Sequence, residues 1–146
     1  EKAAMAITQA ICNSFKLELF EGRHDLDGTD QLKIALYTSS ATLGASTTAY
    51  TTTNEVSGTG YTAGGENLTF ASSTPKLDAA KAILDFNNVT WTDATFTTRG
   101  AQNYNASKGD RAVAVLNFGT DVGVSNGDFT IEFPTADASS AIIRLN

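Results

Sequence analysis

Short runs in which large apolar residues alternate with polar ones constrain this chain more than any other feature. The clearest run is 129–133 (Phe-Thr-Ile-Glu-Phe), and residues 32–37 (Leu-Lys-Ile-Ala-Leu-Tyr) follow the same period of two. That period places alternate side chains on opposite faces of a β-strand, one of which can face a core. Similar short runs occupy residues 67–71, 82–86, 95–104, 112–118 and 141–145. The chain is therefore expected to be mainly β.

The turn signals between these runs favour an antiparallel arrangement. Residues 108–110 (Lys-Gly-Asp) and 125–128 (Ser-Asn-Gly-Asp) tolerate positive φ, which predicts a tight turn at each place. Strands at this spacing predict an antiparallel β-sandwich, of either the jelly-roll or the immunoglobulin-like type. In the two clearest strands we expect one apolar face to be buried: Leu32, Ile34 and Leu36 in one, and Phe129, Ile131 and Phe133 in the other.

One helix is predicted over residues 7–21, ahead of the strands. Its apolar residues recur at intervals of three and four: Ile7, Ala10, Ile11, Phe15 and Leu19. This spacing forms one stripe of a helix, and Gly22 supplies a stop signal. Leu17 and Phe20 lie off that stripe. We therefore expect the helix to be covered on more than one side, by its own sheet or by another subunit.

The chain of 146 residues fits one domain, since no composition break or internal repeat divides it. Residues 1–4 precede Met5, which we take as the natural start, and are interpreted as a cloning remnant or a processed upstream extension. A single domain over residues 5–146 is expected. Cys12 is the only cysteine, so no disulfide can form within the chain.

The charge distribution argues against two classes of partner. The net charge is −6, and the ten Lys and Arg residues are scattered along the chain without a cluster. Nucleic-acid binders and proteins that bind anionic membranes carry a basic stripe or patch. No apolar run is long enough to cross a bilayer. We therefore expect neither a nucleic-acid partner nor a membrane partner.

Residues 25–30 (Asp-Leu-Asp-Gly-Thr-Asp) resemble part of a calcium-binding loop in their acidic spacing. The glycine comes too early, however, and Leu36 stands where the bidentate Glu would be. A solvated loop is the favoured interpretation, with a single-ion surface site as the alternative. His24, the only histidine, is expected to be a surface residue, and one His and one Cys are too few for a zinc site. We expect no metal and no cofactor.

Two further patterns are weak signals of enzyme chemistry. Residues 58–63 (Gly-Thr-Gly-Tyr-Thr-Ala) match the spacing of a dinucleotide fingerprint, but a strand-like run rather than a helix follows. We assign these glycines to turns or bulges. Asp85, Asp93 and Glu132 could supply the two carboxylates of a glycoside hydrolase, yet every β-sheet exposes such residues. We therefore expect no catalytic residues.

Residues 38–65 are rich in Ser, Thr and Gly and are too long for a plain hairpin loop. We interpret this segment as an extended arm or a binding surface. It contains Tyr50 and Tyr61, which are candidate aromatics for packing against a glycan. Trp91 follows a strand-like run and is expected in the core.

Several runs of this sequence resemble those of small virion proteins of tailed bacteriophages. The most characteristic is residues 54–65 (Asn-Glu-Val-Ser-Gly-Thr-Gly-Tyr-Thr-Ala-Gly-Gly). The resemblance extends to residues 5–10, 33–39, 89–94, 99–101 and 126–131, and so covers nearly everything after Met5. It implies a place in a phage particle and supplies no catalytic motif.

The expected function is therefore a non-enzymatic virion structural protein, and first of all a capsid decoration protein. Its expected partners are other virion proteins, major capsid or tail proteins, together with copies of itself in a symmetric homo-oligomer. The helix residues Ile7, Ile11, Phe15 and Leu19 are candidates for that interface, with a core contact as the equal alternative. A tail-associated module that binds a host-surface glycan through Tyr50 or Tyr61 is the second hypothesis.

Overall fold

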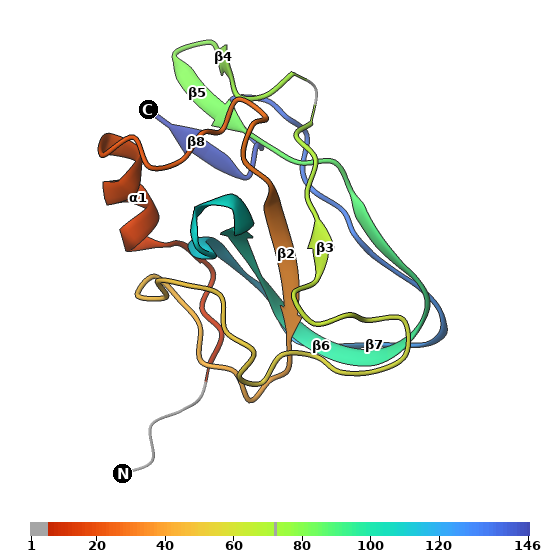
Figure 1. The fold of residues 1–146 in the computed structure, drawn as a ribbon. Helices are drawn as coiled ribbons and strands as arrows, with labels where there is room; N and C mark the ends of the chain where they lie inside the picture. Colours follow the sequence, from red (N-terminus) through yellow and green to blue (C-terminus); the bar gives the residue numbers. More distant parts are fainter. Residues whose placement is uncertain (1–5, 72) are drawn as a thin grey trace.

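Two antiparallel β-sheets and one short helix make up residues 6–71 and 73–146, the part of the chain that the computed structural model describes (Figure 1). The larger sheet has the order β1 (Ala10–Ile11), β7 (Arg111–Ile131), β6 (Val89–Asn105), β2 (Leu32–Tyr37) and β3 (Glu66–Asn67). The smaller has the order β4 (Lys76–Asp78), β5 (Lys81–Leu84) and β8 (Ile143–Leu145). The expected mainly β fold, with its two antiparallel sheets and a short helix near the N-terminus, is confirmed.

The long β6–β7 hairpin dominates the larger sheet and is strongly curved (Figure 1). The 3-10 turn η1 (Ala106–Lys108) connects its strands, and Gly109 and Asp110 follow with φ of 69° and 58°. The predicted turn at 108–110 is thus confirmed. Thr98 pairs with Val122 and Gly100 with Asn117, so β7 has extra, bulged residues between these two pairs. Bulges of this kind increase local twist and allow a strand to turn a corner.

The turn predicted at residues 125–128 is wrong, because this segment lies inside β7. Ala94 pairs with Gly127 and Phe96 with Val124, so two residues of β7 oppose one of β6. Asn126, with φ of 49°, is one of those two. The same tolerance of positive φ that suits a hairpin also suits a bulge, and here the ladder continues past it. The predicted strands 112–118 and 129–133 are consequently two parts of one strand.

An aromatic cluster joins β6 and β7. Phe129 lies against Phe96, Trp91 and Phe118 at ring-centroid distances of 5.4, 5.9 and 6.2 Å. Trp91 is buried, as expected, and so are Phe129 and Ile131, while Phe133 is half-buried. In β2 the predicted inward residues Leu32, Ile34 and Leu36 are all buried.

The helix is shorter than predicted: α1 spans Asn13–Phe20. Ile11 lies in β1, where Cys12 N–H donates to Val113 O at 3.0 Å, and Ile7 forms a parallel bridge with Leu43. Backbone bonds to β7 and to the loop at Leu43 therefore hold the start of the predicted helix extended, in spite of its apolar spacing. The end was predicted correctly, because Gly22 follows the helix with φ of 67°.

Residues 38–65 are not an extended arm, since they lie on the larger sheet. Isolated bridges join Tyr37 to Glu55, Ala49 to Arg111 and Thr59 to Thr95. The glycines at 58 and 60, which were assigned to turns or bulges, lie close against the backbone of β6. A Cβ on Gly60, which has φ of 77°, would lie 2.8 Å from Ala94 Cα. No helix within residues 6–71 and 73–146 is long and apolar enough to cross a membrane.

Candidate functional site

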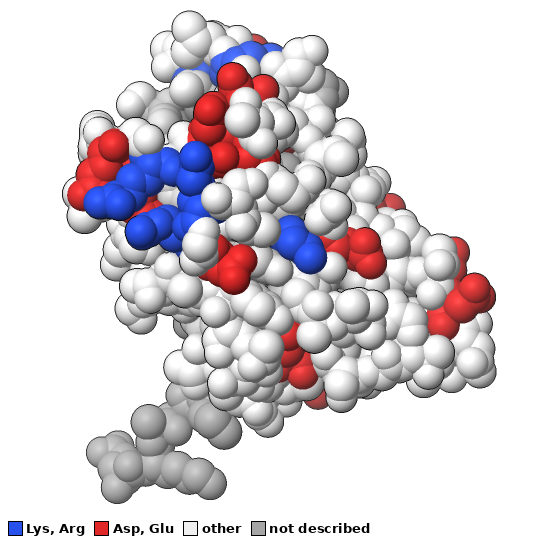
Figure 2. Space-filling model, viewed as in Figure 1, with Lys and Arg blue, Asp and Glu red and all other residues white. Residues whose placement is uncertain are grey.

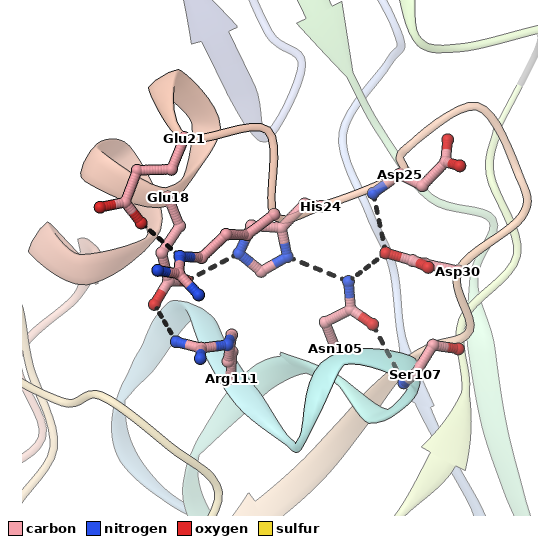
Figure 3. Close-up of polar contacts among 9 residues, drawn as sticks. Glu18, Glu21, His24, Asp25, Asp30, Asn105, Ser107 and Arg111 are labelled. Atoms are coloured by element: carbon pink, nitrogen blue, oxygen red, sulfur yellow. Dashed lines mark hydrogen bonds and ion pairs between the residues drawn. The ribbon is translucent and has the colours of Figure 1, made fainter.

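A buried polar cluster joins α1, the loop after it and the turn of the β6–β7 hairpin (Figure 3). Glu18 comes from α1, His24 and Asp30 from the following loop, Asn105 from the end of β6 and Arg111 from the start of β7. The His24 side chain has no exposed surface, so its prediction as a surface histidine is wrong. The reason is tertiary: His24 packs against Phe15, with ring centroids 4.9 Å apart, and both of its nitrogens find partners.

The hydrogen bonds around Asn105 determine the tautomer of His24. Asn105 Oδ1 accepts from Ser107 N–H at 3.0 Å, so its Nδ2 is the donor group. Nδ2 donates to Asp30 Oδ2 at 2.7 Å and lies 3.0 Å from His24 Nδ1, which must then be an acceptor. Nε2 therefore carries the proton and donates to Glu18 Oε2 at 2.8 Å.

Glu18 is the anionic centre of the cluster. Its Oε1 accepts from Arg111 Nη1 at 2.7 Å, and its Oε2 accepts from His24. Burial alone raises the pKa of the Glu18 carboxyl, but the hydrogen bonds from His24 and Arg111 outweigh burial and hold the pKa below its ordinary value. Glu18 is thus an ionised, buried carboxylate that ties α1 to β7.

The acidic loop at 25–30 is organised around Asp30. Asp30 points inward, where its Oδ2 accepts from Asp25 N–H at 2.8 Å and from Asn105. Burial raises the pKa of Asp30, but these bonds and Lys108, 3.4 Å away, lower it further than burial raises it. Asp27 is exposed and caps its own turn through Thr29 N–H. Within residues 6–71 and 73–146 no group of three or more His, Cys, Asp or Glu could hold a metal ion.

This cluster is suited to holding chain segments together. A Glu–His pair acts as a general base when the free imidazole nitrogen faces a nucleophile. Here that nitrogen, Nδ1, faces the amide of Asn105, 81 residues away in the sequence. The cluster therefore holds α1 and its following loop against the turn of the β6–β7 hairpin.

Sequence reasoning missed Glu18, Asn105 and Arg111. The one local signal was the position of Glu18, three residues after Phe15 and so on the buried face of the helix. Asn105 and Arg111 had no local signal, because Asp30 and Glu18, with which they pair, lie 75 and 93 residues away in the sequence.

Replacing Glu18 with Gln should lower the free energy of unfolding by about 2 kcal/mol at pH 7, because a buried charged acceptor of two hydrogen bonds is lost. The folded-state pKa of Glu18 is depressed. The stabilisation that ionised Glu18 provides is therefore complete above the pKa that Glu18 has in the unfolded chain. It is lost as the pH falls from there through the lower pKa of Glu18 in the folded protein. Urea titrations from pH 7 to pH 3 should show a smaller loss of stability in E18Q than in the parent chain.

Asp121→Asn is the matched control for E18Q. Asp121 pairs with Arg99 at 2.8 Å on the surface, where about half of the Asp121 side chain is exposed. An exposed pair of this kind contributes little, so D121N should change stability by less than about 0.5 kcal/mol. Equal effects of E18Q and D121N would contradict the role assigned to Glu18.

A second polar cluster gathers around Glu55 in the segment 38–65. Tyr61 Oη donates to Glu55 Oε1 at 2.6 Å, and Tyr50 Oη donates to Oε2 at 2.7 Å. Gly64 N–H also donates to Oε1, at 2.8 Å. Tyr50 stacks on Tyr104, with ring centroids 4.7 Å apart. Burial and the bonds to Glu55 raise the pKa of both Tyr50 and Tyr61 well above the ordinary value.

The two tyrosines proposed for glycan binding are thus half-buried, with their hydroxyls turned toward Glu55. A sugar-stacking platform needs an open ring face, and one face of Tyr50 is covered by Tyr104. The structure places both residues where they hold segment 38–65 on the sheet.

Glu55→Gln should loosen this segment. Its carboxylate accepts three hydrogen bonds, and the NH₂ of a Gln side chain would confront one of the three donors. We expect a loss of about 1–3 kcal/mol, together with faster amide hydrogen exchange in residues 49–64 than in β2. Hydrogen exchange read by mass spectrometry measures both regions in one experiment. Uniform acceleration over the whole chain would contradict a local role for Glu55.

The carboxylates considered for hydrolysis lie in different surroundings. Asp85 is completely buried, its Oδ1 accepts from Phe86 N–H, and burial raises its pKa. Glu132 is exposed and lines an open groove of about 310 Å³ with Phe133 and Arg144. Neither Asp85 nor Asp93 lines that groove. Burial also raises the pKa of the Cys12 thiol, to about 11, which keeps it protonated and unreactive at neutral pH.

The four residues proposed for a helix interface face the interior instead. Ile7 and Phe15 are buried in the core, and Ile11 and Leu19 are half-buried against it. The outward-facing apolar residues are others, which lie on α1 and on the smaller sheet. They are Phe20 at 96% exposed, Leu77 at 77%, Leu17 at 60% and Leu145 at 51%.

The surface around α1 combines apolar and charged groups. An apolar groove of about 80 Å³ lies between α1 and the smaller sheet, and Leu19, Ile143 and Leu145 contribute to its walls. Figure 2 shows Lys and Arg side chains next to Asp and Glu side chains over α1 and its following loop. Ion pairs here include Arg111–Glu18 and Lys108–Asp30. The charges on this face are therefore mixed in sign.

No family model matches the chain, and neither a curated protein nor a solved structure matches it.

Proposed function

We propose that this chain is a non-enzymatic structural protein of a tailed-bacteriophage virion, that it decorates the capsid, and that it acts there as a homo-oligomer. The setting comes from the resemblance of its sequence runs to small virion proteins. The longest of these runs, residues 54–65, forms part of the segment that Glu55 holds on the larger sheet. Three side chains of this run serve the fold: Val56 is buried in the core, and Glu55 and Tyr61 are joined by a hydrogen bond.

The observation that carries the proposal is the placement of apolar surface. Phe20 and Leu17 project from α1, and the exposed Leu145 of β8 lies beside this helix, where it lines the apolar groove with Leu19. Exposed apolar groups that gather in one region mark surfaces for protein contacts. The polar clusters around Glu18 and Glu55, by contrast, bind parts of the same chain to one another. Protein binding is the activity that this distribution supports best.

Labelling the protein in intact particles and imaging them by electron microscopy tests the proposal. Label over the head in many copies is the expected result. Label confined to the tail tip would overturn decoration in favour of the host-surface binding module, and particles without label would overturn a virion role altogether. A second measurement adds the purified chain to heads that lack it and follows co-sedimentation, which should saturate at a fixed number of copies per head.

A further inference from the structure

The outward stripe of α1 consists of Lys16, Leu17 and Phe20, and Glu21 continues it at the C-cap, where its carboxylate pairs with Arg23; the core uses none of these residues. Phe20 is 96% exposed and Leu17 60%, while Phe15 and Glu18 on the opposite stripe are buried. Leu17 and Phe20 are three residues apart, so their side chains are neighbours on the helix surface. In Figure 1, α1 lies at the margin of the molecule, next to β8.

This stripe has the pattern of one coiled-coil heptad. Leu17 and Phe20 take the two apolar seam positions, and Lys16 and Glu21 flank them on opposite sides. When two such helices pack in parallel around a two-fold axis, the residue before the first seam position approaches the residue after the second seam position of the other helix. Lys16 of each copy then meets Glu21 of the other, and this contact forms twice.

The charges favour this parallel pairing over its alternative. In an antiparallel pair, Lys16 of one copy would instead approach Lys16 of the other, and Glu21 would approach Glu21 on the opposite flank. Like charges would then meet at both flanks. The stripe is therefore complementary to itself in one orientation. That self-complementarity is what identifies a second copy of the chain as the occupant of this face.

We propose that the chain forms a two-fold dimer in which the outward stripes of two α1 helices pack in parallel, with Leu17 against Leu17, Phe20 against Phe20 and Lys16 beside Glu21. The inference rests on the homo-oligomer included in the proposed function and specifies its contact. It does not require a phage particle.

The size of the stripe sets the expected strength of association. Helix α1 has eight residues, so its outer face is smaller than a standard interface, even when Leu145 beside it is included. We expect a dissociation constant of about 10–100 µM for the free protein. Many copies held close together on a capsid lattice would strengthen the contact through effective concentration.

Sedimentation velocity of the full chain over a concentration series tests the dimer. Phe20→Asp should remove association over the measured range, since it would bury two charges in the seam. Lys16→Glu and Glu21→Lys each turn two attractions into two repulsions, and each should weaken association by about tenfold. The double variant K16E/E21K restores opposite charges and should recover the parent value. Lys76→Glu, an exposed charge reversal on β4, is the matched control and should have no effect.

The single charge variants distinguish the parallel from the antiparallel arrangement, because an antiparallel parent dimer already has like charges on each flank, and K16E or E21K alone would then leave association unchanged. A mixing experiment tests whether the flanking charges carry the effect. K16E carries two acidic flanks and E21K two basic flanks, so a mixture of the two should form a mixed dimer more tightly than either variant forms its own. A parent chain that stays monomeric at 1 mM, or a double variant that fails to recover, would overturn the proposal. These results come from purified protein, so they are independent of where the chain lies in the virion.

Discussion

Gly65→Ala should unfold the protein or lower its free energy of unfolding by roughly 4 kcal/mol or more. Gly65 has φ of 73°, and a Cβ there would lie 1.8 Å from Ile34 O and 2.6 Å from Ile34 C. Those atoms belong to the backbone of β2, which is paired on its other side with β6, so they cannot move away. Guanidinium unfolding followed by Trp91 fluorescence measures the effect, because Trp91 is buried in the folded state.

Gly109→Ala separates the steric effect from the effect of backbone conformation. Gly109 has nearly the same φ, 69°, but a Cβ there would meet nothing within 4 Å. It should therefore show only the cost of a left-handed alanine, about 1–2 kcal/mol. A G65A protein as stable as G109A would mean that the contact of residues 64–65 with β2 is not as close as the structure has it.

Phe15→Ala should lower the free energy of unfolding by about 3–5 kcal/mol, because a fully buried aromatic ring is replaced by a cavity. The phenyl ring also covers His24, so the truncation would admit water to the Glu18–His24 bond. We expect the first turn of the loop after α1 to lose protection from hydrogen exchange. Thermal and chemical unfolding measure the stability change.

Phe20→Ala is the matched control for this substitution, on the other face of the same helix. With the Phe20 side chain almost fully exposed, its removal should change monomer stability by less than about 0.5 kcal/mol. The comparison is made at protein concentrations below 1 µM, where the dimer proposed above is dissociated. If F20A were as destabilising as F15A, the orientation of α1 would be wrong.

Taken together, the two faces of α1 have separate tasks. The inner face, with Phe15 and Glu18, attaches the helix to the core and to Arg111. The outer face, with Leu17 and Phe20, is exposed and is the face proposed above to contact a second copy. Stability and association should therefore respond to different substitutions. The effect of a substitution on folding can then be measured separately from its effect on dimerisation.

Local sequence patterns determined the strands that have one apolar and one polar face. Residues 32–37 were predicted with the bounds that β2 has, and the apolar faces of residues 32–36 and 129–131 are buried as expected. Gly22 and the Gly109 turn were also read correctly. In each of these places the decisive physics is local, since it lies in side-chain alternation or in a φ that glycine tolerates.

Tertiary structure alone decided the rest. The chain before Cys12 is extended because its backbone bonds to β7 and to the loop at Leu43, although its apolar spacing suits a helix. Asn126 and Gly127 lie in a bulge and not in a turn, because β6 continues to pair beyond them. His24 is buried because Glu18 and Asn105, the second of them 81 residues away, satisfy its two nitrogens. Such pairings depend on strand order and on contacts distant in sequence, which side-chain periodicity does not encode.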